Sequence, residues 1–259
     1  MTRYGKIANV EGHGYFQGTH FVVSEYVPGP TLDKVVAEKG PLAPHVAAQL
    51  VAQVAVGLMH AHSCGLIHRD VKPGNIALTP TRRVKLIDLG LTHMLESPWS
   101  RVTKRISTKE YADEIAHTAP EEAWACEMDC RSDVYSLGST FYYLLTGEVP
   151  FPGLAPEMMA ERQIRGVPSP AKLRRGVPPE LDAIVRTMGA KDPHARYQSA
   201  RDVVKALRSW LPVAQQDSLG LSLERPNLGA LTATRLPKPP APEKEKGGIV
   251  AFVRRLFGR

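Results

Sequence analysis

The sequence has few cysteines and no long apolar run, and each shortage excludes a class of protein. Its 259 residues include only three cysteines, Cys64, Cys126 and Cys130, without a second Cys/His pair at zinc-ligand spacing, so free thiols are expected rather than a metal site. No stretch approaches the roughly 18 apolar residues of a membrane-spanning helix. The first ten residues also lack the apolar core of a secretory signal, and we expect a cytoplasmic protein.

An excess of one charge sign is missing from most of the chain. The formal net charge is +7, but residues 225–259 contain eight of the 33 Lys/Arg and only two of the 26 Asp/Glu. The rest of the chain therefore has 25 basic against 24 acidic residues. A nearly neutral globular part argues against a basic surface that reads nucleic acid, so we expect no nucleic-acid partner.

The pattern of apolar residues predicts a mixture of strands and helices. Residues 7–27 alternate apolar stretches with glycine, which predicts two strands joined by a turn, and residues 31–39 follow as a short helix. Residues 41–64 predict a long, half-buried helix. It has apolar residues at four-residue spacing, a proline in its first turn and a glycine beyond its end: Val46, Leu50, Val54, Leu58, Pro44 and Gly65.

Two elements are predicted beyond the long helix. Short apolar runs at 76–78 and 84–87 predict a hairpin, whereas residues 91–118 have no clear period and are expected to form an extended loop. Ser132 is predicted to cap a helix that ends at Gly147. This helix is apolar on most faces, which is typical of the centre of a domain.

The last predicted helix begins at a capping box formed by Ser199 and Asp202, and we expect the compact part to close near Leu211. From about Gln215 the composition changes to a proline-rich stretch followed by EKEKGG, which indicates a mobile linker. The final residues, IVAFVRRLFGR, mix a compact apolar set with three arginines.

One string between the long helix and the hairpin contains the chemistry: residues 68–75, HRDVKPGN. Phosphoryl transfer requires an acceptor hydroxyl held in line, a cation on the moving phosphate and oxygen ligands for Mg²⁺. The string resembles the catalytic loop of Hanks-type (eukaryotic-like) serine/threonine protein kinases. The resemblance implies that Asp70 is the base that positions the acceptor, that Lys72 contacts the transferred phosphoryl group, and that Asn75 binds metal.

Three further motifs follow in family order. Asp88 begins a DLG motif where the family carries DFG, and because a hairpin returns the chain to its start, we expect Asp88 and Asn75 to meet and to ligate Mg²⁺. An APE motif at 119–121 matches the end of the family's activation segment, with Glu121 paired to Arg196. Asp133 is expected to brace the backbone of the catalytic loop.

These four motifs make residues 7–211 resemble the family, since their agreement in order by chance is negligible. The resemblance implies a bacterial member with an α+β, protein-kinase-like fold: a mostly helical large lobe and a truncated small β lobe. It also implies ATP and Mg²⁺ as cofactors. It implies a protein substrate as well, because in this family a lysine two residues after the catalytic aspartate, here Lys72 after Asp70, favours a protein Ser/Thr acceptor. His68 is interpreted as a packed, hydrogen-bonded core residue and Arg69 as a residue that steadies the activation segment.

The adenine pocket is also implied by the resemblance. Glu25 and Val27 match the hinge, which would offer a backbone carbonyl and an amide to ATP, and Ser24 would line the back of the pocket. Ala77 would lie under the adenine, where the family prefers a bulkier residue.

The first half of the small lobe has no counterpart in the sequence. A glycine-rich roof, a lysine and a helix with its glutamate partner should precede the hinge strands, yet no lysine stands between Gly14 and the hinge. We therefore interpret Gly12, Gly14 and Gly18 as a turn between strands, and Lys6 as a surface residue. Phosphoryl transfer by this chain alone is expected to be impaired. The open sheet edge indicates either a partner chain or a natural start upstream of Met1.

A second hypothesis is a pseudokinase or scaffold that binds a partner protein through the large lobe. It is favoured by the missing roof and by Glu114, which stands near the place of a family threonine and would raise the pKa of Asp70 or repel substrate phosphate. Candidate phosphorylation sites on the presumed loop are Thr92, Ser97, Ser100, Thr103, Ser107 and Thr108.

The predicted organisation has four parts. Residues 1–27 are the remnant of the small lobe with its hinge, and residues 28–212 are the large lobe. Residues 213–247 are a Pro-rich flexible linker, and residues 248–259 are a short basic amphipathic tail. This tail is interpreted either as a short helix that contacts an anionic membrane weakly or as a solvated tail.

Overall fold

The computed structural model describes residues 5–16, 19–88, 116–122, 128–153, 161, 164–213 and 221. Residues Met1–Arg225 form one compact unit, and Pro226–Arg259 form a second unit that lies outside the described residues. The basic tail, most of the predicted linker and the predicted loop up to residue 115 also lie outside them. No helix in the described ranges is long and apolar enough to cross a bilayer.

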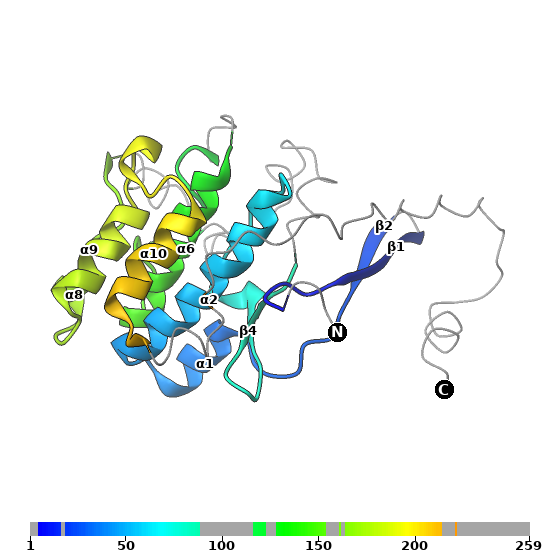
Figure 1. Ribbon diagram of the computed structural model, residues 1–259, viewed down its shortest axis with the longest axis horizontal. Helices are drawn as coiled ribbons and strands as arrows, with labels where there is room; N and C mark the ends of the chain where they lie inside the picture. Colours follow the sequence, from blue (N-terminus) through cyan, green and yellow to red (C-terminus); the bar gives the residue numbers. More distant parts are fainter. Residues whose placement is uncertain are drawn as a thin grey trace. The chain divides into compact units, whose positions relative to one another are not determined.

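Helices form the larger part of the described structure (Figure 1). They are α1 (Leu32–Lys39), α2 (Pro44–Ser63), α6 (Cys130–Thr146), α8 (Pro170–Leu173), α9 (Pro179–Met188) and α10 (Ala200–Trp210), with the 3₁₀ turns η1 (Pro73–Asn75) and η3 (Pro193–Ala195). Helix α2 packs against α6 and α10, and α6 also packs against α9. Their apolar faces meet in one continuous core, which buries most of the hydrophobic surface that stabilises the fold.

Helix α2 is buried more deeply than its sequence pattern predicts. Every residue from 50 to 58 is buried, because α6, α10 and β4 cover different faces of the helix. Alanines and Gly57 between the larger apolar residues allow these close contacts. The prediction that this helix is only half-buried was therefore wrong. The prediction that the helix begins with a proline in its first turn is confirmed.

Helix α6 is the central helix, as its all-round apolar composition predicts, and its end at the left-handed Gly147 is confirmed. The predicted cap was wrong. The side chain of Asp129 accepts the cap hydrogen bond from the Arg131 amide at 2.8 Å, whereas Ser132 lies inside the first turn and donates to Glu121 at 2.8 Å. The Ser199 cap of α10 is confirmed by a 3.3 Å bond from the Asp202 amide.

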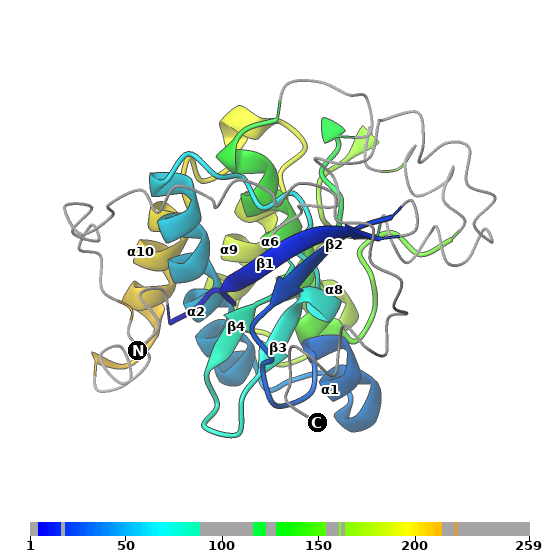
Figure 2. The ribbon, with the colours of Figure 1, turned by 90° about the vertical axis from the view of Figure 1, so that its right-hand side faces the viewer.

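Two small antiparallel sheets accompany the helices (Figure 2). One pairs β1 (Val10–Phe16) with β2 (Thr19–Ser24), and the other pairs β3 (Ile76–Leu78) with β4 (Val84–Leu86). Gly12 and Gly14 lie within β1 rather than in the turn, which corrects their predicted place. A Cβ on Gly14 would come within 2.4 Å of the ring of Phe21 on the opposite strand, so the glycine makes room for that ring.

Two segments extend the β3–β4 sheet on its two sides. On one side, the Ala8 amide donates to the carbonyl of Leu86 at 2.9 Å, and the Leu86 amide donates to the carbonyl of Lys6 at 2.8 Å. On the other side, Thr31 bridges Ala77. The residues before β1 and after the hinge are therefore fixed to the same hairpin that follows the catalytic loop.

Lys6 is not the surface residue that the sequence predicts. Its ammonium group donates to the side-chain oxygen of Gln53 at 2.6 Å, and Gln53 is fully buried in α2. Burial, with the nearby charge of Arg83, lowers the pKa of Lys6 to about 8. The sequence could not show this contact between Lys6 and the helical body, because the partner is a single glutamine 47 positions away.

Candidate active site

The catalytic loop brings three predicted site residues into contact. The side-chain amide nitrogen of Asn75 donates to the carboxylate of Asp70 at 2.7 Å and to the backbone carbonyl of Asp70 at 2.9 Å. The ammonium group of Lys72 lies 2.9 Å from the other carboxylate oxygen of Asp70. The Asp70 carboxylate is thereby held on both sides by hydrogen-bond donors, in one orientation.

Asp133 fixes the backbone of this loop from the first turn of α6, as predicted. Its carboxylate accepts hydrogen bonds from the amides of His68 and Arg69, both at 2.8 Å. It also accepts a bond from His62 at 2.7 Å, a contact that the sequence analysis missed. His62 stands near the end of the long helix, six residues before His68, and this spacing is its only signal in the sequence.

His68 is fully buried and packed, which confirms its interpretation as a core residue. Burial lowers the pKa of its imidazole despite the opposing charges of Asp133, Asp70 and Asp88, so the ring is neutral at physiological pH. Its Nδ1 accepts a bond from the Asp70 amide at 3.3 Å. This hydrogen bond to the buried imidazole helps to fix the backbone at Asp70.

The β3–β4 hairpin returns Asp88 to the end of the catalytic loop. The Ile87 amide donates to the carbonyl of Asn75 at 2.9 Å, and Asp88 is the next residue. Asp88 has a positive φ of 59°, and Arg69, beside Asp70, has a φ of 67°. Left-handed non-glycine residues are uncommon and gather at functional sites, so this backbone agrees with a role for both segments.

Magnesium suits the side chains that remain free here. The side-chain oxygen of Asn75 and the exposed carboxylate of Asp88 have no hydrogen-bond partner among the described residues. An amide oxygen and a carboxylate are the ligands that Mg²⁺ takes from proteins, completed by water and phosphate. Within the described ranges, no cluster of three or more His, Cys, Asp or Glu competes for a metal ion.

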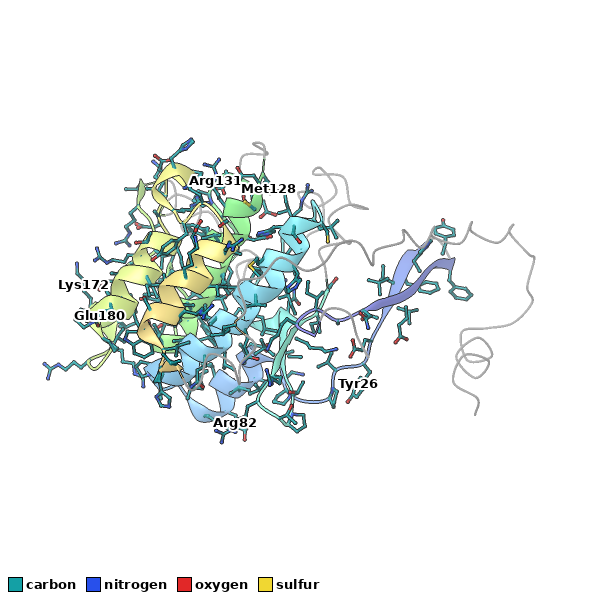
Figure 3. The ribbon with its side chains drawn as sticks, viewed as in Figure 1. Tyr26, Arg82, Met128, Arg131, Lys172 and Glu180 are labelled. Carbon is teal, nitrogen blue, oxygen red and sulfur yellow. The ribbon has the colours of Figure 1, made fainter. Side chains whose placement is uncertain are left out.

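The hinge residues follow β2 and precede α1. The backbone amide of Glu25 donates to the carbonyl of Asn9 at 2.8 Å. The backbone carbonyl of Glu25 and the backbone amide of Val27 make no hydrogen bond to other described residues and are available to a ligand. Tyr26 between them points into solvent (Figure 3). The buried Ala77 on β3 forms a β-bridge with Thr31, which follows the hinge residue Val27 by four positions.

Glu25 has a second role that the sequence analysis missed. Its carboxylate pairs with the ammonium group of Lys85 on β4 and accepts a bond from the Asn9 amide at 3.2 Å. The hydrogen bond from Lys85 is the main reason that the pKa of Glu25 is lowered. The ion pair ties the start of the hinge to the strand that leads to Asp88.

Gly29 allows the chain to leave the hinge close to β3. It has a φ of +123°, and a Cβ there would lie 2.0 Å from the carbonyl oxygen of Leu78. Only glycine fits this close approach. The next residue, Pro30, accepts a bond from the Leu78 amide at 2.8 Å.

Glu121 and Arg196 form the predicted ion pair at the far end of the activation segment. Two guanidinium nitrogens of Arg196 donate to the two oxygens of Glu121 at 2.7 and 2.9 Å. The side chain of Arg196 is fully buried and lies over the ring of Tyr135 at 4.8 Å. Burial alone would raise the pKa of Glu121, but the hydrogen bond and charge of Arg196 lower it overall.

A model of the protein kinase domain matches residues 6–208. The chain belongs to the protein kinase family. The same kinase domain therefore contains the catalytic loop, the hinge and the Glu121–Arg196 pair. The α+β fold with a mainly helical body, expected from the sequence, is confirmed.

Bacterial kinases are among the similar proteins. Serine/threonine-protein kinase PknB of Mycolicibacterium smegmatis is 41% identical over 187 residues, which cover 71% of this chain and 29% of that protein. A probable serine/threonine-protein kinase of Clostridium perfringens is 35% identical over 199 residues, or 76% of this chain and 28% of that protein. The chain thus spans less than a third of the length of these relatives.

A solved kinase structure has the same fold. The crystal structure of Rad53 residues 1–466 in complex with AMP-PNP superposes with a TM-score of 0.60 at 23% identity, over 78% of this chain and 50% of the other. Several predicted parts of the kinase site lie outside the described residues. These are Leu89, Gly90, Glu114 and the candidate phosphorylation sites between 92 and 108, so their roles stay predictions.

Proposed function

We propose that this kinase-family chain transfers the γ-phosphoryl group of ATP to serine and threonine hydroxyls of proteins. The observation that supports this most directly is the contact of Asn75 and Lys72 with the Asp70 carboxylate, at 2.7 and 2.9 Å. It orients one carboxylate beside a cation, as an in-line transfer requires. The names of the bacterial relatives agree with a serine or threonine acceptor.

Each site residue has a separate task in this proposal. Asp70 accepts the proton of the acceptor hydroxyl, and Lys72 contacts the moving phosphoryl group. Asn75 and Asp88 would hold Mg²⁺, which supplies charge neutralisation on the phosphates when it is bound. The Glu25 carbonyl and the Val27 amide bind the adenine edge, and Ala77 lies beneath the ring.

The same chemistry is impaired in this chain when it acts alone. Lys6 is the only lysine before the hinge, and its ammonium group is engaged by Gln53 on α2. The chain therefore offers no lysine from this side to the α- and β-phosphates. Loss of one such donor typically lowers the rate by 10² to 10³.

Phosphate transfer to a general protein acceptor, measured with labelled ATP and Mg²⁺, tests the proposal. Slow transfer by the wild type should fall about 10²-fold or more in Asp70→Asn, while Glu180→Gln on the exposed surface of α9 (Figure 3) should match the wild type. Equal transfer by the wild type and Asp70→Asn would contradict it. Magnesium-dependent nucleotide binding, lost in Asp88→Asn, gives a second readout without turnover.

A partner chain at the open edge of the small lobe is the second candidate, and the β1–β2 hairpin favours it. No described side chain of the two strands is buried, and Tyr15 and Val22 are exposed. We propose that a strand from another polypeptide segment pairs with this open sheet, because a two-stranded hairpin alone is marginal in water. Val22→Lys should abolish such binding in sedimentation experiments and leave the body folded; unchanged binding would exclude this edge.

Weak contact of residues 248–259 with an anionic membrane stays a proposal from the sequence, since the tail lies outside the described residues. A liposome pull-down of the full chain and of a chain without the tail tests it. Equal binding of the two would reject the tail as an anchor.

A further inference from the structure

Lys6 is a lysine outside the kinase site whose ammonium group faces the helical body instead of solvent. Its Nζ donates to the side-chain oxygen of Gln53 at 2.6 Å, and Gln53 is fully buried in α2. The start of the Lys6 side chain lies against Gly57 of the same helix, where an added Cβ would come within 3.3 Å of the Lys6 Cβ. Helix α2 therefore holds the amine in one place.

No negative charge in the described ranges neutralises this ammonium group. Its hydrogen-bond acceptor, Gln53, is uncharged, and the charged group that acts on it is another cation, the guanidinium of Arg83. Arg83 follows the exposed Arg82 in the turn between β3 and β4 (Figure 3). Desolvation and a neighbouring cation both disfavour the protonated form of a lysine, and this arrangement makes the amine nucleophilic.

A structural link between the start of the chain and α2 is a partial explanation of the bond between Lys6 and Gln53. That role does not require a charge, because a neutral amine also donates an N–H to an amide oxygen. Nor does it explain why a second cation, Arg83, lies near a lysine without a carboxylate partner. Loss of one proton would keep the hydrogen bond, remove the repulsion and leave a lone pair on Nζ. A lone pair is what a nucleophile requires.

We propose that Lys6 is a modification site that accepts an acyl group from a small activated donor, either an acyl phosphate or an acyl thioester. The neutral Nζ attacks the carbonyl carbon of the donor, and a C–N bond forms. The C–O or C–S bond to the leaving group breaks, and the proton lost by the amine is taken up by the released phosphate or thiolate. The amide product keeps one N–H for Gln53 and has no charge to repel Arg83. This inference does not depend on the proposed kinase function.

Exposure and protonation at Lys6 agree with such a reaction. Lys6 is half-buried rather than enclosed, and the neighbouring Gly5 and Arg83 are exposed, so a small donor has access to this side of the chain. The pKa of Lys6 is lowered to about 8, which leaves about a quarter of the amine neutral at pH 7.5, against about one part in a thousand for an ordinary lysine. Because nucleophilicity falls with pKa, the expected gain in rate is about tenfold.

Acetylation rates of individual lysines in the full chain, measured by peptide mass spectrometry at pH 7.5, test the inference. Acetyl phosphate is the donor in one arm and a neutral acetyl thioester in the other. Lys172, which is exposed on α8 (Figure 3), is the internal reference. Lys6 should react about tenfold faster than Lys172 with at least one donor, and the donor with the larger ratio identifies the source. A ratio of one or less with both donors would overturn the inference.

Arg83→Gln and the matched control Arg82→Gln separate nucleophilicity from simple access, since both arginines are exposed. With the thioester, Arg83→Gln should slow acetylation of Lys6 about threefold, because it removes the charge that disfavours the ammonium form, and Arg82→Gln should not. In the wild type, the Lys6 rate should level off above about pH 8, while the Lys172 rate should still rise at pH 9.5. Equal effects of the two variants, or parallel pH profiles for the two lysines, would overturn the inference.

Discussion

The β1–β2 hairpin and the catalytic loop differ in a way that their secondary structure does not suggest. The hairpin pairs residues 12–16 with residues 19–23 in one register, with a bulge between Val10 and Gly12, yet none of its described side chains is buried. The catalytic loop has only one short 3₁₀ turn, but its backbone amides are held by the buried Asp133 and its histidine is fully enclosed. The order of this site therefore depends on hydrogen bonds to the buried Asp133 rather than on regular strands.

The largest expected effect comes from removing the buried brace. Asp133→Ala leaves the amides of His68 and Arg69 and the imidazole of His62 without their acceptor, and should lower the free energy of unfolding by about 3 to 5 kcal/mol. Urea denaturation measures it. Asp129→Ala, which removes the exposed cap of the same helix, should cost only about 1 kcal/mol. Similar losses in the two variants would refute the brace.

An intermediate effect is expected at the ion pair between Glu121 and the buried Arg196. The folded-state pKa of Glu121 is lowered, so the Arg196 pair stabilises the protein above the unfolded pKa of about 4.5, and this contribution is lost as pH falls through the folded value. Glu121→Gln should therefore be less stable by about 2 kcal/mol at pH 7 and show a shallower loss towards pH 3. Parallel pH profiles for the two proteins would contradict the pairing.

The smallest effect is expected in the hairpin. Val22→Thr places a hydroxyl on a side chain that is 39% exposed, and should change the free energy of unfolding by less than about 0.5 kcal/mol. The same change at Val54, which is 1% exposed in α2, should lower the free energy of unfolding by about 1 to 3 kcal/mol, because the buried hydroxyl loses its hydrogen bonds to water. Equal costs at the two sites would show that the hairpin has a covered face.

The sequence could predict those features that depend on neighbouring residues or on motifs in a fixed order along the chain. The catalytic-loop string, the Glu121–Arg196 pair and the Asp133 brace stand in a fixed order along the chain, and the helix starts at Pro44 and Ser199 follow from local capping chemistry. These were sufficient for the family and for the fold. The four-residue spacing of α2 could not show how many neighbours surround it, because burial is decided by elements distant in sequence.

The parts that could not be predicted depend on single long-range contacts. Lys6 with Gln53, Glu25 with Lys85, and His62 with Asp133 join ordinary residues 47 to 71 positions apart, and no spacing rule distinguishes them. The α6 cap was misassigned for a local reason: Asp129 and Ser132 are both good caps, and Ser132 instead bonds Glu121 from another segment. Glu114 lies outside the described residues, so its predicted effect on Asp70 stays open to experiment.

Native-state hydrogen exchange of the full chain tests the central comparison most directly, because it reports both regions in one sample. The account predicts that the amides of His68, Arg69 and Ile87 exchange only with opening of the helical body. The amides of β1 and β2 should exchange at least about 100-fold faster. Hairpin amides protected as strongly as those of the catalytic loop would contradict the account.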